Sequence, residues 1–450
     1  MDFKWVIDGA RTRDPKDHNL VLCQLSYDHR IEISRSMIAS PRHPSSFLGY
    51  HYSPMDQPHL QPSALPAVAV PGLYVHIPFC FHKCHYCDFY SITRQTPQRM
   101  SHFVDLILRE ADFWLSTPPK LAPRTVFFGG GTPSLLPANE MRRLIRGLRS
   151  RFDFSLCDEW TVEVNPATLT DDFCGTLLTE GVSRISIGAQ SFDRAELSLL
   201  ERHHEPVDVE QSLAMLRSAG FTRINLDLIY AIPGQTLENW LQSLEQAIAL
   251  ATDHLSCYGL TFEPNTPLAV RRRLGQLSPI DPGLEIEMMH ATRQRLAAAG
   301  LHAYEISNYS KPGQECRHNL LYWTGGDYLG LGPSAASHVR GWRWRNRPHL
   351  GEWENALQNA QLSASDIECL TPHQRAGELA MLMLRLSNGI DPVEFSQRVG
   401  LDAPTLFAEV IDRLVPLGLL NLTKTSIRLS GRGLSVADSI AGEFLAAAGK

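Results

Sequence analysis

The chain has 450 residues, of which 43% are hydrophobic and 20% charged, and its 42 basic and 48 acidic residues give a formal net charge of −6. This composition is typical of a globular protein and excludes a wholly disordered, collagen-like or coiled-coil chain. The negative balance offers no overall positive field for nucleic acid, and no uncharged apolar run reaches the ~18 residues of a spanning helix. We therefore expect a cytoplasmic protein with no nucleic-acid partner.

The first 70 residues are rich in Pro, Ser and His and show no sustained helical or strand periodicity. This pattern predicts a flexible extension over residues 1–70. Translation from Met37 or Met55 is an alternative start for the chain.

From residue 73 onward, short apolar runs alternate with segments whose apolar residues recur at three- and four-residue spacing. The runs predict strands over 73–79, 125–128, 160–164, 184–187, 223–230 and 254–260. The spaced segments predict helices over 99–115, 139–151, 171–180, 207–219 and 237–250. Repeated strand and helix units predict an α/β fold, a partial (β/α)6 TIM-like barrel over 71–300 whose site lies at the carboxyl ends of the strands. Six strands instead of eight would leave a lateral opening.

The remaining third of the chain is predicted to hold two further parts. A helix over 281–299 leads into residues 301–350, which are rich in aromatic residues and glycine and are expected to form a covering segment. Residues 351–450 are predicted to form a small winged-helix-like domain, with helices over 372–386 and 404–414, an apolar hairpin and a final helix.

Three of the nine cysteines, Cys80, Cys84 and Cys87, fall within eight residues directly after the first predicted strand. Nine cysteines are too few for a disulfide scaffold in a chain of this length. Three thiolates on a short loop can hold three irons of a [4Fe-4S] cluster and leave the fourth iron open to a small molecule. A zinc site with His82 or His85 as a fourth ligand, and thiols without a metal, are the alternatives.

Glycines and polar residues follow the next strands. The sequence GGGTP begins at Gly129, and its glycines would let the backbone approach a ligand closely while Thr132 offers a hydroxyl. A glycine run that stands alone is more commonly a plain turn. Glu163 near the end of the third strand and Gln190 after the fourth are expected to face the barrel mouth.

The motifs HIPFCxxxCxYCDF, FFGGGTPSLL, EVNP, RISIGAQSF, NLDLIYAIPGQ and YEISNYSKPG span about residues 73–430. Together they resemble the radical S-adenosylmethionine (SAM) superfamily, within it the oxygen-independent coproporphyrinogen III oxidase group, and most closely the haem chaperone branch of that group. The resemblance implies a [4Fe-4S] cluster on the three cysteines, with SAM on the open iron as the source of a 5′-deoxyadenosyl radical. The positions that match SAM contacts are Tyr74, Tyr86, Gly130, Gly131, Thr132, Glu163, Gln190, Arg202 and Asp227.

Two features favour the chaperone branch. The pattern that the porphyrinogen-oxidising enzymes resemble, Cx3Cx2CxC, has an additional cysteine at the position of Phe89. The residues from His318 to Trp323 match the HNxxYW pattern of haem chaperones, in which an imidazole beside aromatic rings can ligate haem iron. A core histidine with aromatic packing is the alternative interpretation of His318.

The sequence therefore predicts a haem chaperone that binds a [4Fe-4S] cluster, SAM and haem and delivers haem to acceptors such as respiratory enzymes of the membrane. No catalytic residue is assigned. Coproporphyrinogen III dehydrogenase is the alternative from another class, and a barrel that keeps a cluster only for stability is a third. Peripheral membrane association and a homodimer are left open.

Overall fold

The structure is a computed structural model that describes residue 60 and residues 62–449. The extension predicted over residues 1–70, with Met37 and Met55, lies almost wholly outside the described residues. None of the described helices is long and apolar enough to cross a bilayer.

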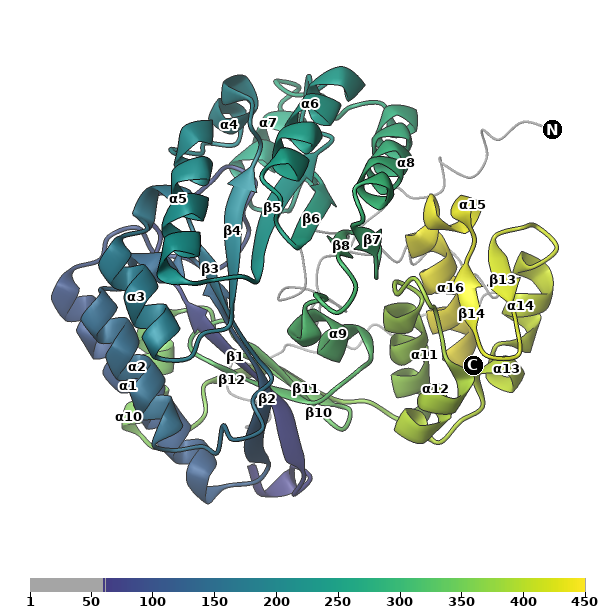
Figure 1. Cartoon of the computed structure of the whole chain (residues 1–450). Coiled ribbons are helices and arrows are strands. Elements are labelled where there is room, and N and C mark those ends of the chain that lie inside the picture. The colour runs from purple at the N-terminus through teal and green to yellow at the C-terminus, as the bar shows by residue number, and fades with distance from the viewer. Residues whose placement is uncertain (1–59, 61, 450) are drawn as a thin grey trace.

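Six parallel strands form the centre of the fold and lie next to one another in chain order. They are β1 (Ala69–Ile77), β2 (Lys120–Gly130), β3 (Glu159–Val164), β4 (Arg184–Gln190), β5 (Ile224–Tyr230) and β6 (His254–Gly259). The helices between and after them are α1 (Pro97–Ser116), α2 (Ala138–Arg149), α3 (Asp171–Thr179), α4 (Arg194–Leu199), α5 (Pro206–Ala219), α6 (Leu237–Ala249), α7 (Pro267–Arg273) and α8 (Pro282–Ala298). The main helices cover the outer face of the curved sheet (Figure 1). The predicted α/β partial barrel is confirmed.

The sheet is wider than the six strands that the sequence predicts. Within the described residues it has twelve strands, because additional strands extend it on both sides. They are β7 (His302–Ala303) and β8 (Asn308–Ser310) beyond β6, and β9 (Tyr328–Leu331), β10 (Ala336–Val339), β11 (Trp342–Asn346) and β12 (Ala364–Cys369) beyond β1. The segment over 301–350, expected only to cover the barrel, thus supplies edge strands. β7 and β8 are too short for an alternating pattern to stand out in the sequence, whereas the alternation of WRWRN in β11 was present but was not assigned to a strand.

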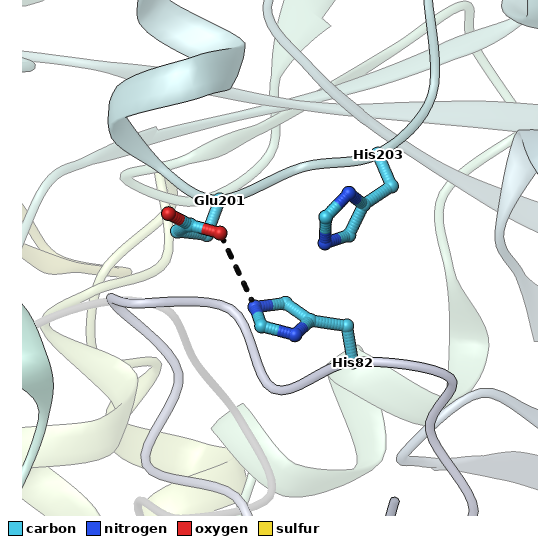
Figure 2. A group of neighbouring side chains, drawn as sticks. All are labelled: His82, Glu201 and His203. Atoms are coloured by element: carbon cyan, nitrogen blue, oxygen red, sulfur yellow. Dashed lines mark ion pairs between the residues drawn. The ribbon is translucent and has the colours of Figure 1, made fainter.

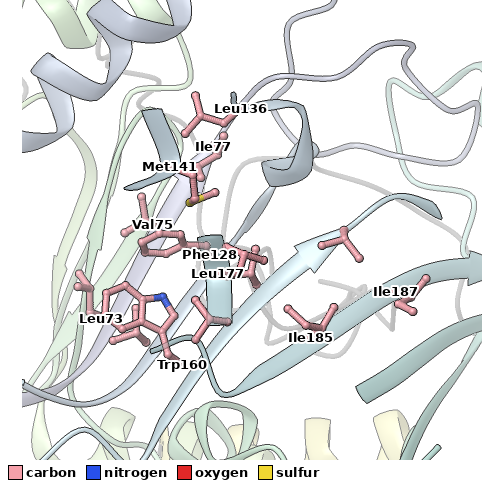
Figure 3. Close-up of a cluster of buried hydrophobic side chains, with 14 of the residues drawn as sticks. Leu73, Val75, Ile77, Phe128, Leu136, Met141, Trp160, Leu177, Ile185 and Ile187 are labelled. Carbon is pink, nitrogen blue, oxygen red and sulfur yellow. The ribbon is translucent and has the colours of Figure 1, made fainter. Parts of the chain in front are cut away.

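The two faces of the sheet differ in polarity. Side chains alternate along each strand, and on β1 to β4 one set packs under the helices: Leu73, Val75, Ile77, Phe128, Trp160, Ile185 and Ile187 lie there with Met141 of α2 and Leu177 of α3 (Figure 3). The opposite set points into the barrel and is largely polar yet buried: Tyr74, His76, Thr125, Thr161, Ser186, Asn225 and Ser256. The barrel therefore encloses a polar interior.

A small domain follows the sheet and lies beside α9 (Arg317–Trp323) (Figure 1). After α10 (Leu350–Gln358) its elements are α11 (Pro372–Met383), α12 (Pro392–Val399), α13 (Ala403–Leu406), α14 (Ala408–Leu414), β13 (Leu420–Leu422), β14 (Ile427–Leu429), α15 (Gly431–Leu434) and α16 (Ala437–Ala448). The predicted hairpin and final helix are confirmed. The helix predicted over 404–414 is divided at Phe407, whose φ of −107° and ψ of 19° leave the helical region.

Candidate cluster and cofactor site

The cysteine loop leaves the carboxyl end of β1 and is fastened at its base. Phe79 forms a β-bridge with Ile92, and the Cys80 amide donates to the Ile92 carbonyl at 3.0 Å. In the middle of the loop, the His85 amide donates to the Leu200 carbonyl, and the His85 carbonyl accepts a hydrogen bond from the Leu268 amide. Phe79 is fully buried in the outer core. The loop is thus held by backbone contacts to both sides of the barrel mouth.

Cys80, Cys84 and Cys87 are free thiols of intermediate exposure, and all line one cavity of about 510 Å³ at this mouth. Burial raises the pKa of Cys80 and of Cys87 above that of an ordinary thiol. Two donors face the sulfurs: the Thr132 hydroxyl lies 3.7 Å from the Cys80 Sγ, and Arg202 Nη1 lies 3.7 Å from the Cys84 Sγ. Three sulfurs with donors beside them fit the ligand set of a [4Fe-4S] cluster.

The GGGTP segment packs directly against the cysteine loop. The Gly131 amide donates to the Ile77 carbonyl at 2.8 Å, and the Thr132 amide donates to the Phe79 carbonyl at 2.6 Å. A Cβ on Gly131 would lie 2.7 Å from that Phe79 oxygen, and Gly130 has a φ of 106°. Glycine is therefore required here for contact between two backbones and for a left-handed conformation. The same packing places Thr132 beside Cys80.

Glu163 brings a half-buried carboxyl group to the cavity wall. It accepts a hydrogen bond from the Gly130 amide at 3.2 Å. Burial, reinforced by the neighbouring Asp227, raises its pKa to about 8. Asp227 accepts hydrogen bonds from Ser186 at 2.9 Å and from Asn225 at 2.8 Å, and burial raises its pKa as well. A cation in the cavity would favour the ionised form of these acids.

Arg202 and Gln190 meet at the end of β4. Arg202 Nη2 donates to the Gly188 carbonyl at 2.5 Å. A Cβ on Gly188 would lie 3.0 Å from Gln190 Nε2 and 3.4 Å from Arg202 Nη2, so both side chains approach this glycine. Gln190 has a φ of 68°, and its buried Oε1 has no hydrogen-bond partner among the described residues.

The cavity gathers some of the predicted cofactor positions but not all. Those that line it are Tyr86, Gly130, Gly131, Thr132, Glu163 and Arg202, together with Phe89. Tyr74 and Gln190 are buried and Asp227 is half-buried, and all three lie outside its lining. Asn165 and Thr168 also line the cavity, beside Ser134, and were not predicted from the sequence. The EVNP motif, which contains both Glu163 and Asn165, was the sequence signal that could have identified Asn165.

His318 lies away from this cavity, at the amino end of the strands. It is fully buried, and Nδ1 lies 2.9 Å from the Thr125 hydroxyl while Nε2 lies 2.8 Å from the Tyr322 hydroxyl. Its ring stacks on Phe127 with centroids 5.4 Å apart. Burial lowers the pKa of His318 to about 3. Both ring nitrogens are thus engaged inside the protein.

The rest of the HNxxYW motif joins the barrel to the small domain. Tyr322 and Trp323 belong to a buried cluster with Met381 and Leu382 of α11, and the Arg385 guanidinium lies 5.0 Å from the Trp323 ring. The cavity next to Tyr322 measures about 20 Å³, which suits one water molecule. Haem would need several hundred Å³. Ligation by His318 would therefore require α9 to move.

Comparison with known proteins agrees with this architecture. Residues 74–247 match the radical SAM superfamily, and residues 370–436 match the HemN C-terminal domain. Coproporphyrinogen III oxidase (HemN) from Escherichia coli has the same fold, with a TM-score of 0.74 at 23% identity over 85% of this chain and 92% of that chain. The chain is therefore a radical SAM protein with a HemN-type C-terminal domain.

Sequence relatives define the family more narrowly. The heme chaperone HemW of Lactococcus lactis is 33% identical over 373 residues, which are 83% of this chain and 96% of the relative. HemW of Mycobacterium tuberculosis is 33% identical over 87% of this chain and 98% of the relative. HemW of E. coli is 40% identical over 60% of this chain and 70% of the relative. The chain belongs to the HemW family of haem chaperones.

Proposed function

We propose that this chain is a haem chaperone that holds a [4Fe-4S] cluster on Cys80, Cys84 and Cys87, binds SAM beside it and transfers haem to acceptor proteins. One observation carries the cofactor part: three thiols line a cavity that also presents Glu163 and Arg202, and among the described residues no fourth cysteine lines it. When bound, such a cluster with SAM supplies one-electron chemistry. The chain's own residues bind, orient and shield these groups.

The residues assigned to SAM binding form two groups, those that line the cavity and those that lie behind its wall. Tyr86, Gly130, Gly131, Thr132, Glu163 and Arg202 line the cavity and are proposed as direct contacts. Tyr74, Gln190 and Asp227 are proposed to support them from the barrel interior. A carboxylate suits the hydroxyl or amino groups of SAM, and a guanidinium suits its carboxylate.

A cytoplasmic location and transfer of haem to respiratory proteins stay expectations from the sequence. A role for His318 as a haem ligand also stays a prediction. In the described structure it requires that His318 leave Thr125 or Tyr322.

Haem titration of anaerobically reconstituted protein, followed by the Soret band, tests the proposal. We expect stoichiometric binding. Comparison of His318→Ala with Tyr322→Phe then tests the ligand: the second variant removes the partner of Nε2 but keeps the imidazole. Weaker binding only in His318→Ala would assign the ligand. No specific haem binding, together with turnover of coproporphyrinogen III under reducing conditions, would overturn the chaperone proposal in favour of the dehydrogenase.

A further inference from the structure

A second group of metal-ligating side chains lies in the wall of the cavity, apart from the three cysteines. His82, Glu201 and His203 each offer one ligand atom, and these atoms lie within 4.8 Å of one another (Figure 2). His82 belongs to the cysteine loop, whereas Glu201 and His203 come from the segment between α4 and α5. Two separate parts of the chain thus converge on one point.

We propose that His82, Glu201 and His203 bind one divalent transition-metal ion, for which Zn²⁺ is the best fit, at a site separate from the cluster. Two imidazole nitrogens and one carboxylate oxygen suit zinc and its neighbours, whereas magnesium and calcium prefer sets made of oxygen alone. The three residues line the cavity, so ions reach them from solvent. Three protein ligands leave a coordination position open on the cavity side.

The distances agree with a site close to its bound geometry. Bonds of the length usual for zinc place neighbouring ligands of a tetrahedral site about 3.3 Å apart. His82 Nε2 and Glu201 Oε2 lie 3.4 Å apart. The His203 ring stands nearly perpendicular to that of His82, with centroids 4.6 Å apart. Because His203 is exposed, a small rotation of its side chain can bring the third ligand in.

A second histidine of the cysteine loop also faces Glu201: His85 Nε2 lies 3.9 Å from Glu201 Oε1. The position of the carboxylate is fixed by the end of α4. Glu201 has a φ of 56° there, and the Arg202 amide donates to the Leu197 carbonyl at 2.9 Å, as in a Schellman motif. The helix end therefore presents Glu201 to the histidines of the cysteine loop.

A bound ion would join the cysteine loop to the segment that carries Arg202. His82 lies between two of the cluster cysteines in sequence, and Arg202 lies between two of the metal ligands. The ion would therefore help to hold Arg202 near Cys84, from which it is 3.7 Å distant. Metal binding at these three residues needs neither haem nor SAM, so it goes beyond the proposed function.

Cobalt(II) is a suitable probe because its visible bands report coordination, while zinc is spectroscopically silent. We expect the anaerobically reconstituted protein to bind one equivalent of Co²⁺, without the charge-transfer band of thiolate ligands, and to release it to Zn²⁺. His203→Ala and Glu201→Gly should each weaken binding at least about tenfold. His373→Ala, which removes an exposed histidine on α11, is the matched control and should bind as the wild type does.

Two further measurements keep the outcome decisive. Glu201→Gly should not lower the unfolding temperature of the metal-free protein, because glycine suits a φ of 56°. The titration is repeated in a variant with Cys80→Ser, Cys84→Ser and Cys87→Ser, which separates this site from any failure of cluster assembly. Absence of stoichiometric Co²⁺ binding in both backgrounds, or binding that neither His203→Ala nor Glu201→Gly weakens, would overturn the proposal.

Discussion

The two ends of the barrel carry the two most distinctive motifs of the chain, and the structure treats them differently. At the carboxyl end, the cysteines are partly exposed in a cavity of about 510 Å³. At the amino end, His318 is completely buried, hydrogen-bonded at both ring nitrogens and next to a cavity of about 20 Å³. The two motifs are equally distinctive in the sequence. Only the cysteine motif has room for a ligand beside it, because packing closes the end that holds His318.

The largest effect is expected at the open end. Cys80→Ala, Cys84→Ala or Cys87→Ala should abolish the cluster, because two thiolates do not replace three. Iron and sulfide contents and the visible absorption after anaerobic reconstitution are the measurements. Cys369→Ala, which removes an exposed cysteine, serves as the control and should retain the cluster. Undiminished iron in any of the three loop variants would refute the assignment.

At the closed end, the expected effect is on stability. Glu159 is buried and accepts hydrogen bonds from the His318 amide at 3.1 Å and from Arg223 at 2.8 Å. Glu159→Gln leaves the guanidinium without its counter-charge and should lower the free energy of unfolding by about 3 kcal/mol. Denaturant unfolding measures it.

The neighbouring Asp158 provides the control for that experiment. Its ion pair with Arg124 is largely exposed, so Asp158→Asn should change stability by less than about 1 kcal/mol. Cluster content should be unchanged in both variants. If Glu159→Gln lost its cluster while remaining folded, the two ends would be coupled, and the contrast drawn between them would be wrong.

The pH dependence of stability tests the closed end further. The pKa of His318 is about 3 in the folded protein and near 6.5 when unfolded, so the unfolded chain binds the additional proton. Stability should therefore fall as the pH drops below about 6.5, by up to about 1.4 kcal/mol per pH unit for this group. His76 and His204, whose pKa values are also lowered, add to the slope.

The contribution of His318 is obtained by difference. Between pH 6.5 and 5, the slope of the unfolding free energy against pH gives the number of protons taken up on unfolding. His318→Gln should reduce that number by about one, whereas His373→Gln should leave it as in the wild type. Equal slopes in all three proteins would mean that His318 takes up protons in the folded state, and hence that α9 opens readily.

The sequence predicted the parallel strands well because their outward side chains follow a regular apolar alternation, as in Leu73, Val75 and Ile77. It failed for the edge strands, which depend on neighbours distant in the chain: β9 joins β1, some 250 residues earlier. The cysteine motif was predictable because its ligands are close in sequence. The group formed by His82, Glu201 and His203 was not, since only folding brings the cysteine loop to the segment after α4.

The smallest effect concerns how far the open end reaches into the barrel. Glu163 lines the cavity whereas Asp227 does not, so Glu163→Gln should weaken SAM binding about tenfold, and Asp227→Asn by less than about threefold. Calorimetry on reconstituted protein measures both.

Because the pKa of Glu163 is about 8, SAM affinity of the wild type should rise between pH 7 and 9 as this carboxyl ionises. Since Asp227 helps to raise that pKa, Asp227→Asn should move the rise to lower pH. A tenfold loss in Asp227→Asn at every pH would instead make Asp227 a direct contact and extend the open end one layer deeper.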